Sequence, residues 1–142
     1  MIKEYQNIYP TRIFFGVGVT KEEYAEYFDD EDSFENIGDI NCAIRANAKK
    51  DSDFIYTSKN IKKSILILIQ EEDMLSMPII IHEIMHNIVF ICKYIEHGVS
   101  EEDESLAYYA EYLINCYLDF LNSVKTYPKK LKVLMKNLDL LK

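Results

Sequence analysis

Two of the three histidines in this chain are four residues apart, and a glutamate directly follows the first. His82, Glu83 and His86 together form the pattern H-E-x-x-H. Residues four apart lie on one face of an α-helix, so the two imidazoles can bind a single metal ion. In proteins with this pattern the histidines bind zinc and the glutamate is the general base of a peptidase. The spacing therefore predicts zinc-dependent hydrolysis.

The flanking residues predict the helix that this chemistry requires. Ser76 lies just before Pro78, which suits the first turn of a helix, and an apolar run continues to Ile95. The alternative is an apolar core helix that carries the three polar groups by chance. Burying them without partners would cost on the order of 2 kcal/mol each, whereas a metal ion with a water molecule satisfies all three. The pattern therefore favours a metal site.

Catalytic zinc usually has three protein ligands and a water molecule, so a third ligand is expected. If the next helix forms a simple antiparallel hairpin with the motif helix, a residue near Glu111 faces His86, but if the helices cross, Glu104 is nearer. The spacing leaves both open. The downstream candidates are His97, Glu101, Glu102, Asp103, Glu104 and Glu111.

The motif followed by Glu104-Ser105-Leu106-Ala107-Tyr108 resembles the gluzincin type of zinc peptidase. Residues 10–120 are more closely similar to small HExxH proteins of bacteriophages and mobile elements. The resemblance implies a zincin-like domain, a metallopeptidase with catalytic Glu83, and zinc (Zn2+) bound by His82, His86 and Glu104, with Glu111 as second candidate. The alternative is a non-catalytic zincin-like structural or partner-binding protein of a phage or mobile element.

Other residues depart from better-known zinc patterns. The third histidine of metzincins is absent, because Cys92 stands six residues after His86. His97 comes eleven residues after His86, a spacing more typical of a surface residue. Tyr108 and Tyr109 could supply a phenol to the transition state, although aromatic residues at such positions more often belong to the core.

Composition narrows the class of protein. A chain of 142 residues is expected to form one domain, residues 1–142, and its net charge of −8 argues against nucleic-acid binding. The start of the chain does not resemble a secretory signal, and no apolar run is long enough to span a membrane. Three scattered cysteines predict reduced thiols. We expect an intracellular protein, in the host cytoplasm or the virion if phage-encoded, whose partner is a peptide or protein substrate.

The segments before the motif predict an α+β fold with a small, mostly antiparallel sheet. The strand over 64–70 is apolar on both faces, which predicts an interior or covered strand, and it is also the candidate edge for binding an extended substrate. Gly16 and Gly18 do not complete a phosphate-binding loop. The predicted strands are 11–19, 40–48, 54–57 and 64–70; a capped helix is predicted over 20–28 and an acidic loop over 29–35.

Two helices are predicted after the motif helix. The first runs from about Glu101 to Asn122, behind a stop at Gly98. The second covers residues 128–142 and carries leucines on one face among several lysines. Either this basic helix packs on the chain's own core, or it docks on a protein partner.

Overall fold

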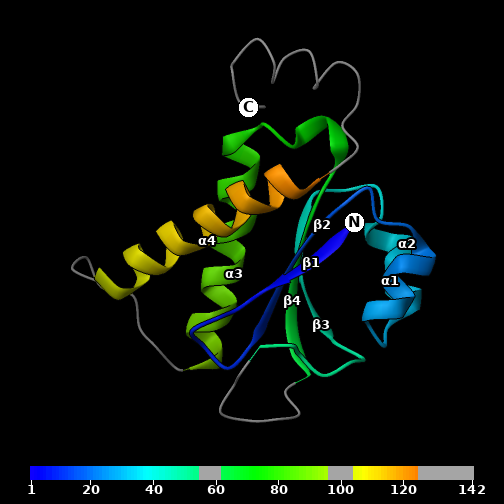
Figure 1. Cartoon of the computed structure of the whole chain (residues 1–142), viewed down its shortest axis with the longest axis horizontal. Coiled ribbons are helices and arrows are strands. Elements are labelled where there is room, and N and C mark those ends of the chain that lie inside the picture. The colour runs from blue at the N-terminus through cyan, green and yellow to red at the C-terminus, as the bar shows by residue number, and fades with distance from the viewer. Residues whose placement is uncertain (55–61, 96–103, 125–142) are drawn as a thin grey trace.

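The computed structural model describes residues 1–54, 62–95 and 104–124, and these form a four-stranded sheet with helices on both of its faces (Figure 1). The predicted α+β class is confirmed. The elements, in chain order, are β1 (Ile2–Tyr5), β2 (Arg12–Val17), α1 (Lys21–Tyr27), the 3-10 helix η1 (Glu31–Ser33), α2 (Phe34–Ile37), β3 (Cys42–Asn47), β4 (Lys63–Ile69), the 3-10 helix η2 (Glu71–Asp73), α3 (Met77–Tyr94) and α4 (Glu104–Ser123).

The strand order in the sheet is β1-β2-β4-β3. The β1–β2 and β3–β4 pairs are antiparallel, and the central β2–β4 pair is parallel. The predicted interior position of the strand over 64–70 is confirmed, because β4 has a partner on each side. The proposal that this strand offers an edge to a substrate is wrong for the same reason. The edges of the sheet are β1 and β3.

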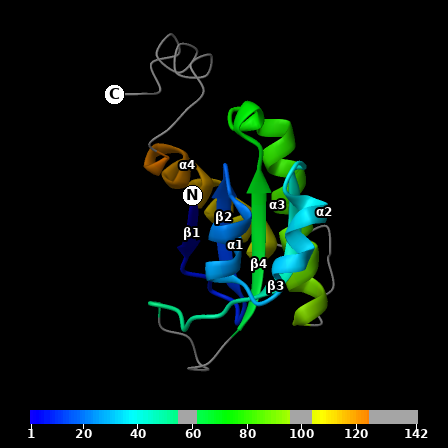
Figure 2. The same cartoon turned by 90° about the vertical axis from the view of Figure 1, so that its right-hand side faces the viewer.

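The alternation of side chains explains why β4 is apolar on both faces. Ile65 and Ile67 face the core that α3 and α4 cover, while Leu66 and Leu68 face a second core under α1 and α2. Figure 1 shows α1 and α2 on one side of the sheet and α3 on the other, and in Figure 2 α1 lies in front of the strands. The result is three layers: α1 and α2, the sheet, and α3 with α4. Within its layer, α3 packs over β3 and β4.

Two local features differ from the sequence prediction. β1 was not predicted, because it is short and only its first and last residues, Ile2 and Tyr5, are apolar or aromatic. The residues from Asp29 to Glu35, predicted as a loop, instead contain η1 and the start of α2. There the Phe34 ring packs 5.3 Å from the ring of Tyr24, a contact between segments that local sequence does not reveal.

Contacts at long sequence separation hold β1 in place. The Tyr5 hydroxyl donates to Asp119 Oδ2 on α4 at 2.6 Å, and Lys3 Nζ donates to the same oxygen at 3.1 Å. These hydrogen bonds, led by that from Tyr5, lower the pKa of the Asp119 carboxyl group. They attach the edge strand β1 to α4.

Two glycines, Gly16 within β2 and Gly18 just after it, have distinct structural reasons. Gly18 has a φ of +58°, a conformation that residues with a side chain rarely adopt. A Cβ atom on Gly16 would lie 2.9 Å from Val19 Cγ2. The expectation of close packing is confirmed at Gly16. The chain then enters α1, where the Thr20 side chain accepts the predicted capping bond from the Glu23 N–H.

The helices that follow the sheet agree with the prediction where the structure describes them. Pro78 lies in the first turn of α3, as expected, and α3 ends at Tyr94. None of the helices in the described ranges combines the length and the apolar character that crossing a bilayer requires. Several predicted features fall outside the described residues: Gly98, residues 101–103, the basic helix over 128–142 and almost all of the strand over 54–57.

Candidate metal centre

Helix α3 presents its two histidines to solvent and its glutamate to the interior. His82 and His86 are exposed, whereas Glu83 is only 4% exposed. The buried face of α3 is set by residues that pack against the sheet and α4, Ile80, Ile84, Ile88 and Ile91 among them. Glu83 lies three residues after Ile80 and four before Asn87, so it shares their buried face, whereas His82 and His86 lie off that face.

The two imidazoles are arranged as a pair. His82 Nε2 and His86 Nε2 lie 3.1 Å apart, and their rings meet edge to face with centroids 4.8 Å apart. Two histidine nitrogens on one tetrahedral zinc ion, each about 2.0–2.1 Å from it, are separated by roughly 3.3 Å. The observed distance matches that separation. Without a metal ion, one ring must donate a hydrogen bond to the other.

Glu83 brings a carboxylate beside the two rings without a full set of partners. Its Oε1 is 3.8 Å from His82 Nε2, and its buried Oε2 has no hydrogen-bond partner in the described part of the chain. Burial raises the pKa of the Glu83 carboxyl group, while the neighbouring His82 and His86 lower it. A carboxylate oxygen left unpaired inside a protein is costly, so a group that satisfies it is expected.

These observations test whether the residues fit a metal ion. Ligand atoms of His82, Glu83 and His86 all lie within 4.8 Å of one another, and this is the one such cluster within residues 1–54, 62–95 and 104–124. The donor set of two imidazoles and a carboxylate suits zinc. The two paired nitrogens, with a carboxylate oxygen of Glu83 within 4.8 Å of them, leave a position that an ion could occupy. The chain therefore carries a group that could hold a metal ion.

The three polar groups of the motif are not all buried, contrary to the expectation from the apolar helix. Both histidines reach solvent. The side chain of His82 is 69% exposed. The burial cost therefore applies to Glu83 alone. The second support for the metal site is the 3.1 Å distance between the two histidine nitrogens.

Helix α4 is anchored beside the histidines by one buried hydrogen bond. Asn87 Nδ2 donates to the Tyr109 hydroxyl at 3.2 Å, and both side chains are buried. Burial raises the pKa of Tyr109. Because Asn87 follows His86 directly, this bond holds α4 against the part of α3 that carries the motif, and Figure 1 shows that α4 crosses α3.

Neither candidate for the third ligand joins the close cluster. Glu104 is exposed at the first residue of α4, five residues and so about 7.5 Å along the helix axis before Tyr109. Glu111 is also exposed, two residues beyond Tyr109. The ligand role of Glu104 stays a prediction, with Glu111 as its alternative.

The remaining residues that the sequence analysis considered have separate environments. Tyr109 belongs to the core, which was the alternative to a catalytic role for this residue. Its neighbour Tyr108 is 66% exposed. Cys92 and Cys116 are buried free thiols, and Cys42 is a half-buried one. His97 falls outside the described residues, as do Glu101, Glu102 and Asp103.

Sequence reasoning overlooked a group of residues next to the histidines. The ring of Phe90 stacks on that of His86, with centroids 6.4 Å apart, and the Arg45 guanidinium carbon lies 4.9 Å from the centre of the Phe90 ring. The spacing of Phe90, four residues after His86, was the signal that could have placed it on the same helical face. Nothing local could have placed Arg45, because it comes from β3.

Comparisons with known proteins add no functional information, so the functional conclusion rests on the candidate site. No protein-family model, no curated protein and no solved structure matches the chain.

Proposed function

We propose that the protein is a zinc-dependent metallopeptidase that cleaves peptide bonds in a peptide or protein substrate. The observation that carries this proposal is the pair of exposed imidazole nitrogens 3.1 Å apart, beside the buried and unpaired carboxylate oxygen of Glu83. His82 and His86 hold the zinc ion, with Glu104 on α4 as the third ligand. When bound, zinc supplies a Lewis acid that polarises the scissile carbonyl group and acidifies a water molecule.

Glu83 performs the proton transfers in this mechanism. Its carboxylate accepts a proton from the attacking water molecule and then donates it to the leaving amine. Burial among apolar residues suits this role, because a raised carboxyl pKa brings a general base closer to neutral pH.

The outer edge of β3 up to Arg45 is the surface on which we propose that the substrate lies; beyond it, the Asp29 N–H already donates to Asn47 O. The N–H of Ala48 donates to Lys62 O, so alternate residues of β3 bond to β4, and the backbone groups of Ala43 and Arg45 point away from it. Those groups have no backbone partner among the described residues. An extended peptide can therefore add to β3 as a further strand.

The exposure of the site favours an enzyme over the structural alternative. A structural zinc site is closed by four protein ligands, whereas a catalytic one keeps a position open. His82 is 69% exposed at its side chain, which leaves room for a substrate. The similarity to HExxH proteins of phages and mobile elements, and a docking role for residues 128–142, remain proposals that rest on sequence.

Cleavage of a peptide library is the experiment that tests this function. Zinc-loaded protein, incubated with a mixture of defined peptides and followed by mass spectrometry, is expected to generate new termini. A zinc chelator should abolish them, and added zinc should restore them. Product formation that continues at the same rate in the presence of chelator would contradict a zinc peptidase.

The third ligand can be identified by zinc affinity. Glu104→Ala is expected to weaken zinc binding by more than roughly 100-fold, because loss of a direct ligand exceeds the usual effect of an outer-shell change. Glu111→Ala is its matched control, since it removes the same carboxylate from the same helix. Competition with a chromogenic chelator measures both. A larger loss in Glu111→Ala would transfer the ligand role to Glu111.

A further inference from the structure

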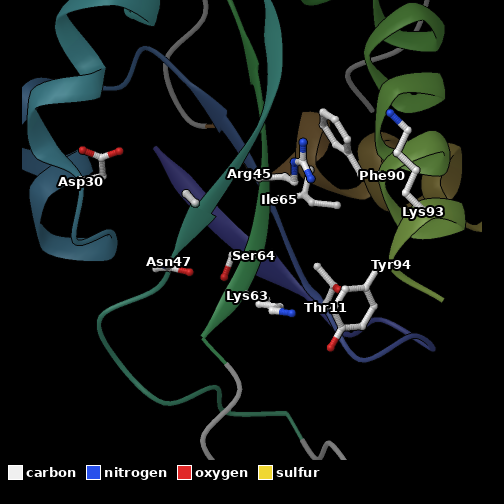
Figure 3. Close-up of a pocket in the computed structure, with 11 residues that line it drawn as sticks. Thr11, Asp30, Arg45, Asn47, Lys63, Ser64, Ile65, Phe90, Lys93 and Tyr94 are labelled. Carbon is white, nitrogen blue, oxygen red and sulfur yellow. The ribbon is translucent and has the colours of Figure 1, made fainter. Parts of the chain in front are cut away.

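A cavity of about 390 Å³ lies between the end of β3, the start of β4 and the C-terminal half of α3. Three cationic side chains line it, one from each of these elements: Arg45, Lys63 and Lys93. Figure 3 shows them on the same side of the sheet as Phe90 and Tyr94. The net charge of the whole protein is −8, so this cluster of cations is opposite in sign to the overall charge.

Aromatic rings hold two of these cations in position. The Arg45 guanidinium carbon lies 4.9 Å from the centre of the Phe90 ring, and Lys63 Nζ lies 4.3 Å from that of Tyr94. The face of an aromatic ring attracts and orients a cation without neutralising its charge. The charges therefore remain available to an incoming anion.

The cavity has little negative charge of its own. Within the described residues, none of Arg45, Lys63 and Lys93 forms an ion pair. The lining includes one carboxylate, that of Asp30, and Figure 3 shows it on the opposite side of β3 from the three cations. The cavity thus has an excess of positive charge.

Phe90 connects the cavity to the candidate metal centre. One of its neighbours is the ring of His86, and it lines the cavity itself. Phe90 and Tyr94 follow His86 by four and eight residues, which is about 6 and 12 Å along the helix axis. A substrate that reaches both sites needs only a few extended residues between them, at about 3.3 Å each.

The direction of β3 indicates which part of a substrate reaches the cavity. β3 is antiparallel to β4, and α3 runs back along the sheet from the end of β4, with Phe90 of α3 against Arg45 of β3 (Figure 1). β3 and α3 therefore run in the same direction. A peptide added antiparallel to β3, which is the more stable pairing, enters at the C-terminal end of α3 and proceeds towards the histidines.

We infer that this cavity binds an acidic side chain of the substrate, glutamate or aspartate, two to four residues before the scissile bond. The connection to cleavage rests on the proposed peptidase function, but binding of the carboxylate does not. The cations that line the cavity, Arg45, Lys63 and Lys93, supply the positive charge that attracts the carboxylate, and the rings of Phe90 and Tyr94 contact its aliphatic stem.

Binding is tested first, without catalysis. N-acetyl-glutamate N-methylamide, titrated into the full-length protein, is expected to shift the backbone NMR signals of Arg45, Lys63 and Phe90. The isosteric glutamine probe lacks the charge and is expected to leave them unchanged. Equal shifts with both probes would overturn the inference.

A neighbouring lysine provides the matched control. Lys63→Gln should weaken binding of the glutamate probe by roughly threefold to tenfold, the range between an exposed and a partly buried charged hydrogen bond. Lys62→Gln removes the same charge one residue away, where Lys62 pairs with Asp51 at 2.9 Å, and should leave binding unchanged. Equal losses of binding in both variants would mean that the probe responds to the overall charge of the protein and not to the cavity, which would overturn the inference.

A second pair of probes identifies the source of the carboxylate. N-acetyl-alanine offers a terminal carboxylate, and its N-methylamide does not. The glutamate probe is expected to bind more tightly than N-acetyl-alanine. The reverse order would mean that the cavity receives a chain terminus, which contradicts the assignment to a side chain.

Cleavage of paired peptides completes the test. Peptides with glutamate two to four residues before the cleaved bond are expected to have a higher kcat/KM than their glutamine counterparts, and Arg45→Gln should reduce that ratio. Cleavage without any preference for glutamate would refute the inference and leave the peptidase function intact. Selective binding of the glutamate probe without cleavage would refute the peptidase function and leave the cavity assignment intact.

Discussion

Replacing His82 or His86 by alanine is expected to remove zinc from the protein. Purified under mild conditions, the wild-type chain should contain close to one zinc ion, because its two Nε2 atoms already lie 3.1 Å apart. Either substitution leaves a single imidazole and destroys the pair. Elemental analysis of the purified proteins measures the loss.

Thermal unfolding provides a second measurement of the same prediction. Zinc at a hundredfold excess over its Kd stabilises a folded protein by about 2.7 kcal/mol, which corresponds to a rise in Tm on the order of 10 °C for a chain of this size. The wild type should show this rise and the two histidine variants should not. Met85→Ala, a change at an exposed residue of the same helix, is the control. Stoichiometric zinc in both histidine variants would disprove the site.

Glu83→Gln is expected to abolish peptide cleavage while the protein keeps its fold and its zinc. Glutamine has the size and shape of glutamate but cannot accept the proton of the attacking water molecule. The loss of a general base lowers kcat by about 10²–10⁴-fold. The peptide-library assay measures cleavage, and elemental analysis measures the zinc that the variant retains.

The control for this variant is Glu72→Gln, which removes the same charge from an exposed position in η2. It should cleave peptides at the wild-type rate. Wild-type turnover in Glu83→Gln would contradict the proposed mechanism. Loss of zinc from Glu83→Gln would instead make Glu83 a ligand, which its place within 4.8 Å of the histidine nitrogens allows.

The sequence by itself determined the elements whose causes are local. The H-E-x-x-H spacing places two imidazoles on one face of any helix, and the residues around Pro78 and Thr20 start helices through their own chemistry. The unbroken apolar run of β4 predicted an interior strand, since a strand with two buried faces cannot alternate. For this reason the α+β class and the candidate metal ligands on α3 could be predicted.

Tertiary structure alone decided the features that depend on contacts across the chain. It gave β1 its place through a hydrogen bond from Tyr5 to Asp119, and it made β3 rather than β4 the edge strand. It also buried Glu83 while exposing His82, because the packing of α3 on the sheet sets which face turns inward. The cationic cavity combines residues from three separate elements, so no window of sequence contains it.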